Sequence, residues 1–178
     1  MKIKKSTLKI IQGDIAEFEA DAVFCPDTYA ISMSSGLSQV IRAKEGEEIF
    51  ESTREHIPVE KGGIIYSAVK KLKVSYVIWG AVIDPDSEIN RDEVQKAINS
   101  AMELCVTLSL KSIAFPMITS PLAFIPYDTF ARLILESIFD FLLAHEEYSL
   151  NVNFVLFNEE AYNKVKSHLD IIRQEYFI

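Results

Sequence analysis

The sequence has few cysteines, a deficit of basic residues and no long apolar run. Its two cysteines, Cys25 and Cys105, lack metal-ligand spacing and cannot build a disulfide framework. Lysine and arginine number 18 against 26 acidic residues, a net charge of −8, which argues against a general nucleic-acid surface. No apolar run approaches the ~20 residues that cross a bilayer, and no apolar signal segment follows the lysine-rich start. We therefore expect a cytoplasmic protein with no membrane contact and no metal site.

The composition that is present predicts one globular domain over residues 1–178. Hydrophobic residues make up 49% of the chain, enough for a substantial core, and neither linkers nor repeats divide it. Strand-length apolar runs alternate with helical patterns. Strands are expected at 8–12, 21–25, 62–69, 74–82, 113–117 and 152–157, and helices at 39–55 (broken at Gly46), 90–108, 128–144 and 159–173. This order predicts an α/β protein, a three-layer α/β/α sandwich with a mixed central sheet.

Two junctions, each a short apolar strand that runs into a loop and then a helix, are the most informative local feature. The first spans 21–38 and includes Ser34, Ser35 and Gly36, and the second spans 112–128 and includes Thr119 and Ser120. Ligands of open α/β sheets bind where strand ends meet helix starts. The unpaired N–H groups of a helix start suit phosphate. Two such loops facing each other predict a clamp for a diphosphate.

Several motifs, taken in order, resemble the macro domain, a fold that binds ADP-ribose. Gly13-Asp14-Ile15 is similar to the opening motif of that family, and Asp21-Ala22-Val23 is similar to its next strand. Residues 113–116, Ile-Ala-Phe-Pro, match a later strand end. The resemblance implies that Asp14 accepts from an adenine amino group and that the N–H of Ile15 faces the base. No cofactor is implied beyond this nucleotide ligand.

The loops depart from the family pattern. Cys25 and Thr28 stand where active members carry two asparagines, so no catalytic residue is assigned. Only Gly36 remains of a run of loop glycines that let N–H groups approach phosphate oxygens. In the second loop, Pro121 replaces a glycine and removes a backbone donor. These departures predict weak binding.

The candidate ligand-binding residues carry structural alternatives. The candidates are Asp14, Ile15, Ser34, Ser35, Gly36, Leu37, Thr119, Ser120 and Phe124. Asp14 is equally suited to capping a short helix or turn, and Ser35 or Ser38 to capping the helix that follows. Asp27 is interpreted as a turn residue rather than a base near a ribose, and Cys25 as a small core residue rather than a nucleophile. The acidic stretch 45–55 is interpreted as a solvated helix face.

Three functions remain open from the sequence. The first is a divergent macro domain that binds ADP-ribose or a related nucleotide weakly. The second is a domain that kept the fold without the ligand and acts as an interaction or structural protein, and the third is a hydrolase of ADP-ribose conjugates. The apolar end Tyr176-Phe177-Ile178 is expected to dock on the domain or to mediate self-association.

Overall fold

The computed structural model of the chain describes residues 1–86, 88–118 and 127–177. Its strands are β1 (Lys2–Ile3), β2 (Ser6–Gln12), β3 (Ala22–Thr28), β4 (Ile64–Ala68), β5 (Tyr76–Ile83), β6 (Ser112–Phe115) and β7 (Asn151–Leu156). Its helices are α1 (Gly36–Glu45), α2 (Glu47–Thr53), α3 (Arg91–Thr107), α4 (Tyr127–Ala144) and α5 (Glu159–Phe177), with short 3-10 helices η1 (Ile15–Glu17) and η2 (Arg54–His56).

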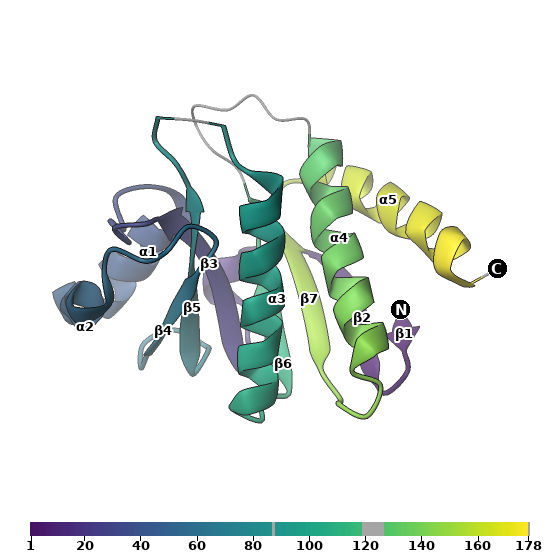
Figure 1. Cartoon of the computed structure of the whole chain (residues 1–178), viewed down its shortest axis with the longest axis horizontal. Coiled ribbons are helices and arrows are strands. Elements are labelled where there is room, and N and C mark those ends of the chain that lie inside the picture. The colour runs from purple at the N-terminus through teal and green to yellow at the C-terminus, as the bar shows by residue number, and fades with distance from the viewer. Residues whose placement is uncertain (87, 119–126, 178) are drawn as a thin grey trace.

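These strands form one mixed sheet in the order β1-β2-β7-β6-β3-β5-β4 (Figure 1). The five central strands are parallel, and β1 and β4 are antiparallel edges. Helices α3, α4 and α5 cover one face, and α1 and α2 cover the other. The predicted three-layer sandwich with a mixed sheet is confirmed.

Two separate cores explain why the central strands read as continuous apolar runs. In β3, Ala22 and Phe24 face the core under α3, α4 and α5, whereas Val23 and Cys25 face the core under α1 and α2. A strand buried on both faces has no solvent side for polar residues. Packing is tight enough to require a glycine, because a Cβ on Gly80 would lie 2.3 Å from the Phe24 ring.

Most element boundaries differ from the sequence expectation by one or more residues, and the end of β3 is the most informative of them. Strand β3 continues through Pro26 and Asp27 to Thr28, although we expected it to end at Cys25. Proline is excluded from strands with neighbours on both sides, but β6 pairs with β3 only at Ala22 and Val23. Pro26 therefore lies where β3 has lost one of its two partners. Helix α5 runs on to Phe177, and α4 begins at Tyr127, one residue before the expected start.

The same divergence of β3 and β6 marks the switch point of the fold. The chain leaves β3 toward α1 on one face and leaves β6 toward α4 on the other. Open α/β sheets bind ligands outside the carboxyl ends of the strands at such a point. Within the described ranges, no helix has both the length and the apolar character to cross a membrane.

Candidate functional site

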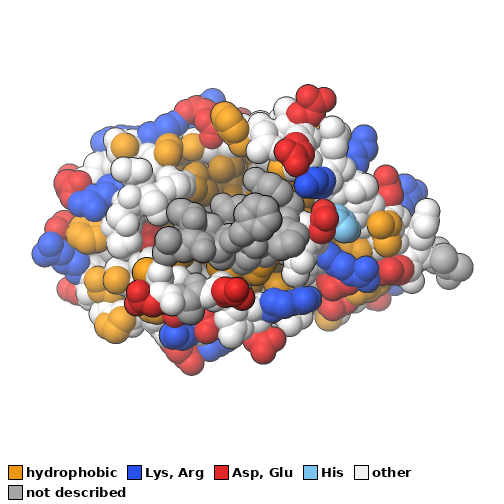
Figure 2. Space-filling view, turned by 90° about the horizontal axis from the view of Figure 1, so that it is seen from above, with side chains coloured by type: hydrophobic (Ala, Val, Ile, Leu, Met, Phe, Trp, Pro, Cys, Tyr) orange, Lys and Arg blue, Asp and Glu red, His pale blue; other side chains and the backbone are white. Residues whose placement is uncertain are grey.

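A cavity of about 200 Å³ opens at the carboxyl edge of the sheet, next to the ends of β2, β6 and β7. Seen onto this edge, apolar side chains gather in a hollow with acidic and basic side chains interspersed around it (Figure 2). The cavity is lined by Gly13, Asp14, Ile15, Pro116, Met117, Val155, Leu156, Phe157, Asn158 and Ala161. It is smaller than the ~300–1,000 Å³ of pockets for drug-sized ligands, so it suits one ring system of a larger ligand.

Asp14 lies at this cavity, and it also caps a short helix, the structural role that we expected as the alternative to ligand binding. It is the N-cap residue of η1, and its Oδ1 accepts from the backbone N–H of Ala16 at 2.9 Å. The Gly13 N–H donates to the carbonyl of Leu156 at 2.9 Å, which ties the segment to the end of β7. The side chain is exposed, and its Oδ2 has no hydrogen-bond partner among the described residues. One carboxylate oxygen therefore remains available to a ligand.

Phe157 and Asn158 are cavity residues that the sequence reasoning missed. Phe157 follows β7 directly and is 81% exposed, an unusual position for a large aromatic ring. Asn158 caps α5, because its Oδ1 accepts from the N–H of Ala161 at 2.7 Å. The missed signal was a third strand–loop–helix junction, in which a phenylalanine lies one residue beyond the last buried residue of the strand.

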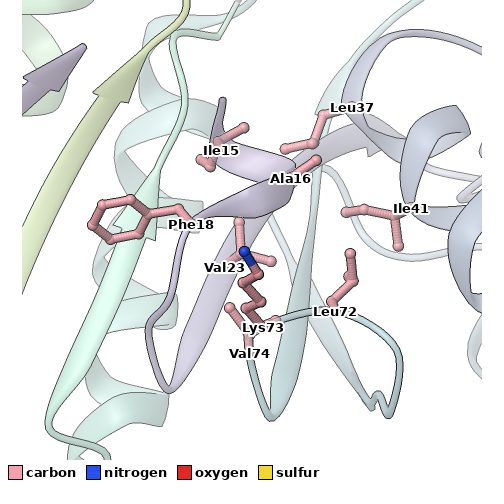
Figure 3. Close-up of a pocket in the computed structure, with 9 residues that line it drawn as sticks. All are labelled: Ile15, Ala16, Phe18, Val23, Leu37, Ile41, Leu72, Lys73 and Val74. Atoms are coloured by element: carbon pink, nitrogen blue, oxygen red, sulfur yellow. The ribbon is translucent and has the colours of Figure 1, made fainter. Parts of the chain in front are cut away.

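A narrow apolar seam holds η1 against α1. Ile15 and Ala16 of η1 point toward Leu37 and Ile41 of α1, above the turn that carries Leu72 (Figure 3). The seam does not admit a water-sized sphere, so it is a packing contact rather than a ligand site. Since Ile15 lines both the seam and the cavity, the seam fixes the cavity beside the start of α1.

The loop from β3 to α1 has an uncommon backbone. Ile31, Met33 and Gly36 have φ angles of 43°, 49° and 58°, in the left-handed region. Such angles are rare for residues other than glycine, and a β-branched residue there is a true outlier. The side chains of Ile31 and Met33 are 0% and 1% exposed. Burial of these two side chains therefore holds the loop in a conformation that glycine would adopt without strain.

The Asp27 carboxylate holds the same loop through hydrogen bonds. Its side chain is 4% exposed, and it accepts from the backbone N–H of Thr28 at 2.6 Å and of Met33 at 3.0 Å. It also accepts from the hydroxyl of Ser32 at 3.3 Å. The interpretation of Asp27 as a turn residue is therefore wrong, because it belongs to β3 and is a buried anchor for the following loop.

The start of α1 leaves its backbone donors available. Ser35 is the N-cap residue but makes no side-chain capping bond, and Ser38 donates its hydroxyl to the carbonyl of Ser35 at 3.0 Å. The first N–H groups of a helix, here at Gly36 and Leu37, have no partner within the helix. These donors and the partial positive charge of the helix start suit an anion.

Other sequence expectations have clear outcomes. Cys25 is fully buried, as expected of a core residue, and burial together with the nearby Asp27 carboxylate raises the pKa of its thiol well above the ordinary value. Glu45 is not a solvated residue, because its carboxylate accepts from the N–H groups of Lys70, Lys71 and Leu72. Thr119, Ser120 and Phe124 lie outside the described residues. In the described part of the chain, no group of three or more His, Cys, Asp or Glu side chains is placed to hold a metal ion.

Comparisons with known proteins agree on one family. The family model described as Macro domain matches residues 29–134. A protein of Sulfurisphaera tokodaii described only as uncharacterized is 34% identical over 166 residues, which cover 88% of this chain and 87% of that protein. A variant of the Oceanobacillus iheyensis macrodomain, solved with ADPR, superposes with a TM-score of 0.86 at 22% identity over 98% of this chain and 97% of that chain. The Trypanosoma brucei macrodomain in complex with ADP-ribose has a TM-score of 0.81 at 18% identity, over 91% of this chain and 68% of that chain.

Proposed function

We propose that this chain, which belongs to the macro domain family, binds ADP-ribose or a closely related nucleotide along the carboxyl edge of its sheet. The observation that carries the proposal is the cavity beside Asp14 and Phe157 at the carboxyl edge of the sheet. The start of α1 lies at the same edge. Solved macrodomains of the same fold hold ADPR or ADP-ribose.

The cavity suits the adenine base. Its floor is apolar, as a flat heteroaromatic ring requires, and Val155, Leu156 and Ala161 contribute to it. The exposed ring of Phe157 offers a face for stacking. The available Oδ2 of Asp14 accepts from an exocyclic amino group, and the N–H of Ile15 reaches the ring edge.

The diphosphate lies at the start of α1 in this proposal. Backbone N–H groups of Ser34, Ser35, Gly36 and Leu37 face it. Binding is weak because Met33, Ser34 and Ser35 carry side chains where close approach to phosphate favours glycine. The net charge of −8 further disfavours an anionic ligand.

The experiment is a calorimetric titration with ADP-ribose at low salt, with AMP and ribose 5-phosphate as partial ligands. We expect saturable one-to-one binding of ADP-ribose. Phe157→Ala is expected to weaken it roughly 5- to 150-fold, because base–aromatic stacking contributes ~1–3 kcal/mol. Thermal stability should hardly change, since the ring is exposed.

Tyr66→Ala is the matched control. Tyr66 is another exposed aromatic residue, 47% accessible, on edge strand β4 away from the cavity. Its loss should leave ADP-ribose affinity unchanged. Neither heat nor thermal stabilisation at millimolar ADP-ribose would contradict the proposal and favour a domain that kept the fold without the ligand. Release of ADP-ribose from an ADP-ribosylated peptide would instead favour the hydrolase.

A further inference from the structure

We propose that Asp27 orients the hydroxyl groups of Ser32 and Ser34 so that the Ser34 oxygen can only accept a hydrogen bond from a ligand. Ser34 thereby favours a ligand in which a sugar, rather than a third phosphate, follows the diphosphate. This inference rests on the proposed function and names a specificity-determining residue, Ser34, with a positioning residue, Asp27. Ser34 stands in the loop where the family resemblance implies a run of glycines, and Asp27 stands between the two positions at which it implies asparagines.

The chain of polar groups runs from the buried carboxylate to the surface. Asp27 is 4% exposed, Ser32 is half-buried and Ser34 is exposed. Ser32 donates to Asp27 Oδ1 at 3.3 Å, and its oxygen lies 2.9 Å from the Ser34 oxygen. Thr28 also donates its hydroxyl to the Ser32 oxygen at 3.4 Å.

Counting donors fixes the direction of this chain. An ionised carboxylate only accepts, and it already accepts from the N–H groups of Thr28 and Met33. A bond to a charged acceptor is stronger than one to a neutral hydroxyl, so Ser32 gives its single hydrogen to Asp27. Its two lone pairs then accept from Thr28 and Ser34. Ser34 therefore donates its only hydroxyl hydrogen to Ser32, and its two lone pairs face solvent.

An oxygen of this kind discriminates between ligand groups. It accepts from a hydroxyl, which is a donor, and repels a phosphate oxygen, which at neutral pH is only an acceptor. Ser34 therefore favours a neutral polyol over a further phosphate.

The order of strands puts Ser34 at the far end of the ligand. The cavity proposed for the base extends from the end of β2, where Asp14 lies, past β7 to the end of β6, whereas the Ser34 loop follows β3. The distance that matters is the one from the Asp14 side of the cavity, where the amino group of the base is expected. Two strands, β7 and β6, separate β2 from β3. Three strand spacings of ~4.8 Å give roughly 14 Å between the two ends. A base at one end thus leaves the group beyond the diphosphate near Ser34.

The test compares dissociation constants for ADP-ribose, ADP and ATP in the wild type and in Ser34→Ala. ADP lacks the terminal sugar, and ATP carries a phosphate in its place. We expect the wild type to prefer ADP-ribose over ADP, and Ser34→Ala to lower that preference about fivefold, the effect of one hydrogen bond. ATP should bind the wild type no more tightly than ADP. Comparing the same ligands across variants cancels their difference in charge.

Two further variants separate positioning from general stability. Ser34→Thr keeps the hydroxyl and should keep the preference for ADP-ribose. Asp27→Asn should lower the preference as Ser34→Ala does, and the double variant should lower it no further, because the residues act through one chain. Asp21→Asn is the matched control, since Asp21 also accepts two backbone N–H bonds, from Lys111 and Ser112, at the opposite end of β3. It should lower thermal stability without changing the preference.

The outcomes distinguish this inference from the proposed function. Equal affinity of the wild type for ADP and ADP-ribose, or an unchanged preference in Ser34→Ala, would overturn the role of Ser34 and leave nucleotide binding intact. An unchanged preference in Asp27→Asn would overturn the positioning role of Asp27. Failure of all three nucleotides to bind the wild type would overturn both proposals.

Discussion

At the scale of single residues, buried side chains fix the loop conformation at the carboxyl edge of the sheet. Asp27 anchors the loop after β3 by accepting from the backbone N–H groups of Thr28 and Met33. Burial of the Met33 side chain holds the backbone at Met33 in the left-handed region. Cys25 lies two residues before Asp27 and is a protonated core thiol. The core position of Cys25 could be predicted from the apolar strand that contains it, whereas the role of Asp27 could not, because it depends on the loop residues that surround the carboxylate.

The two thiols make the stability of the protein pH-dependent in the alkaline range. Burial raises the pKa of Cys25 well above its ordinary value of 9.0 and raises the pKa of Cys105 to about 12. The unfolded chain releases these protons near pH 9, whereas the folded chain retains them. Since the folded state then binds more protons, the free energy of unfolding should fall as pH rises from about 9 toward 12, by at most ~1.4 kcal/mol per pH unit and thiol.

Urea unfolding at a series of pH values between 8 and 11 measures this effect. The double variant Cys25→Ala, Cys105→Ala is the control, because it retains every tyrosine and lysine that also titrates in this range. Its free energy of unfolding should fall less steeply with pH than that of the wild type. Parallel curves for the two proteins would show that the thiols do not carry the effect.

At the scale of elements, helix α3 shows how local sequence sets both ends of a helix. Asn90 caps its start by accepting from the N–H groups of Asp92 and Glu93. At its end, Ser109 donates to the carbonyl of Val106 and Leu110 donates to that of Cys105. This pair of bonds is a Schellman motif, which places Ser109 at the left-handed position that glycine favours. Its φ angle is 56°.

Ser109→Gly should therefore stabilise the protein by roughly 0.5–1 kcal/mol. Glycine relieves the cost of a left-handed backbone, and Ser109 is exposed, so little packing is lost. The free energy of unfolding in urea is the measurement. Ser167→Gly is the control: Ser167 is exposed within α5, where glycine should destabilise the helix by a few tenths of a kcal/mol. A destabilising effect at position 109 would contradict this reading of the motif.

Strand β3 shows where element prediction fails. Its first four residues form an apolar run that indicates a buried strand, and the strand is there. The continuation through Pro26 and Asp27 could not be predicted, since proline argues against a central strand. It exists because β6 parts from β3 after Val23, a feature of pairing between segments that are distant in sequence.

At the scale of the whole molecule, the C-terminal helix completes the layer of α3, α4 and α5. Tyr176 packs on Phe139 of α4, with 5.3 Å between ring centroids, and donates its hydroxyl to Asp140 at 2.9 Å. The expectation that this end docks on the domain is confirmed for Tyr176. Self-association through the same end stays a prediction.

The acidic balance of the molecule should affect how an anionic nucleotide arrives. With a net charge of −8, long-range repulsion slows the approach of ADP-ribose. Raising the ionic strength from 0.01 M to 0.15 M shortens the Debye length from about 30 Å to about 8 Å and screens that repulsion. The association rate constant of ADP-ribose, measured by stopped flow, should therefore increase with salt.

Adenosine is the control ligand because it carries no charge. Its association rate constant should stay constant over the same range of salt. A rate constant for ADP-ribose that decreases with salt would indicate a local cationic field that outweighs the net charge of the protein.

The sequence by itself determined the class of fold and indicated the edge of the sheet at which we propose the site. Buried apolar runs and helical periodicity are local properties, and they were enough to indicate the layers, the mixed sheet and the junctions between strands and helices in which Asp14 and Gly36 lie. Only the tertiary structure decided the cavity lined by Phe157, the anchoring of a loop by Asp27 and the need for glycine at position 80. Each of these depends on side chains that are far apart in the chain and meet only when the sheet is assembled.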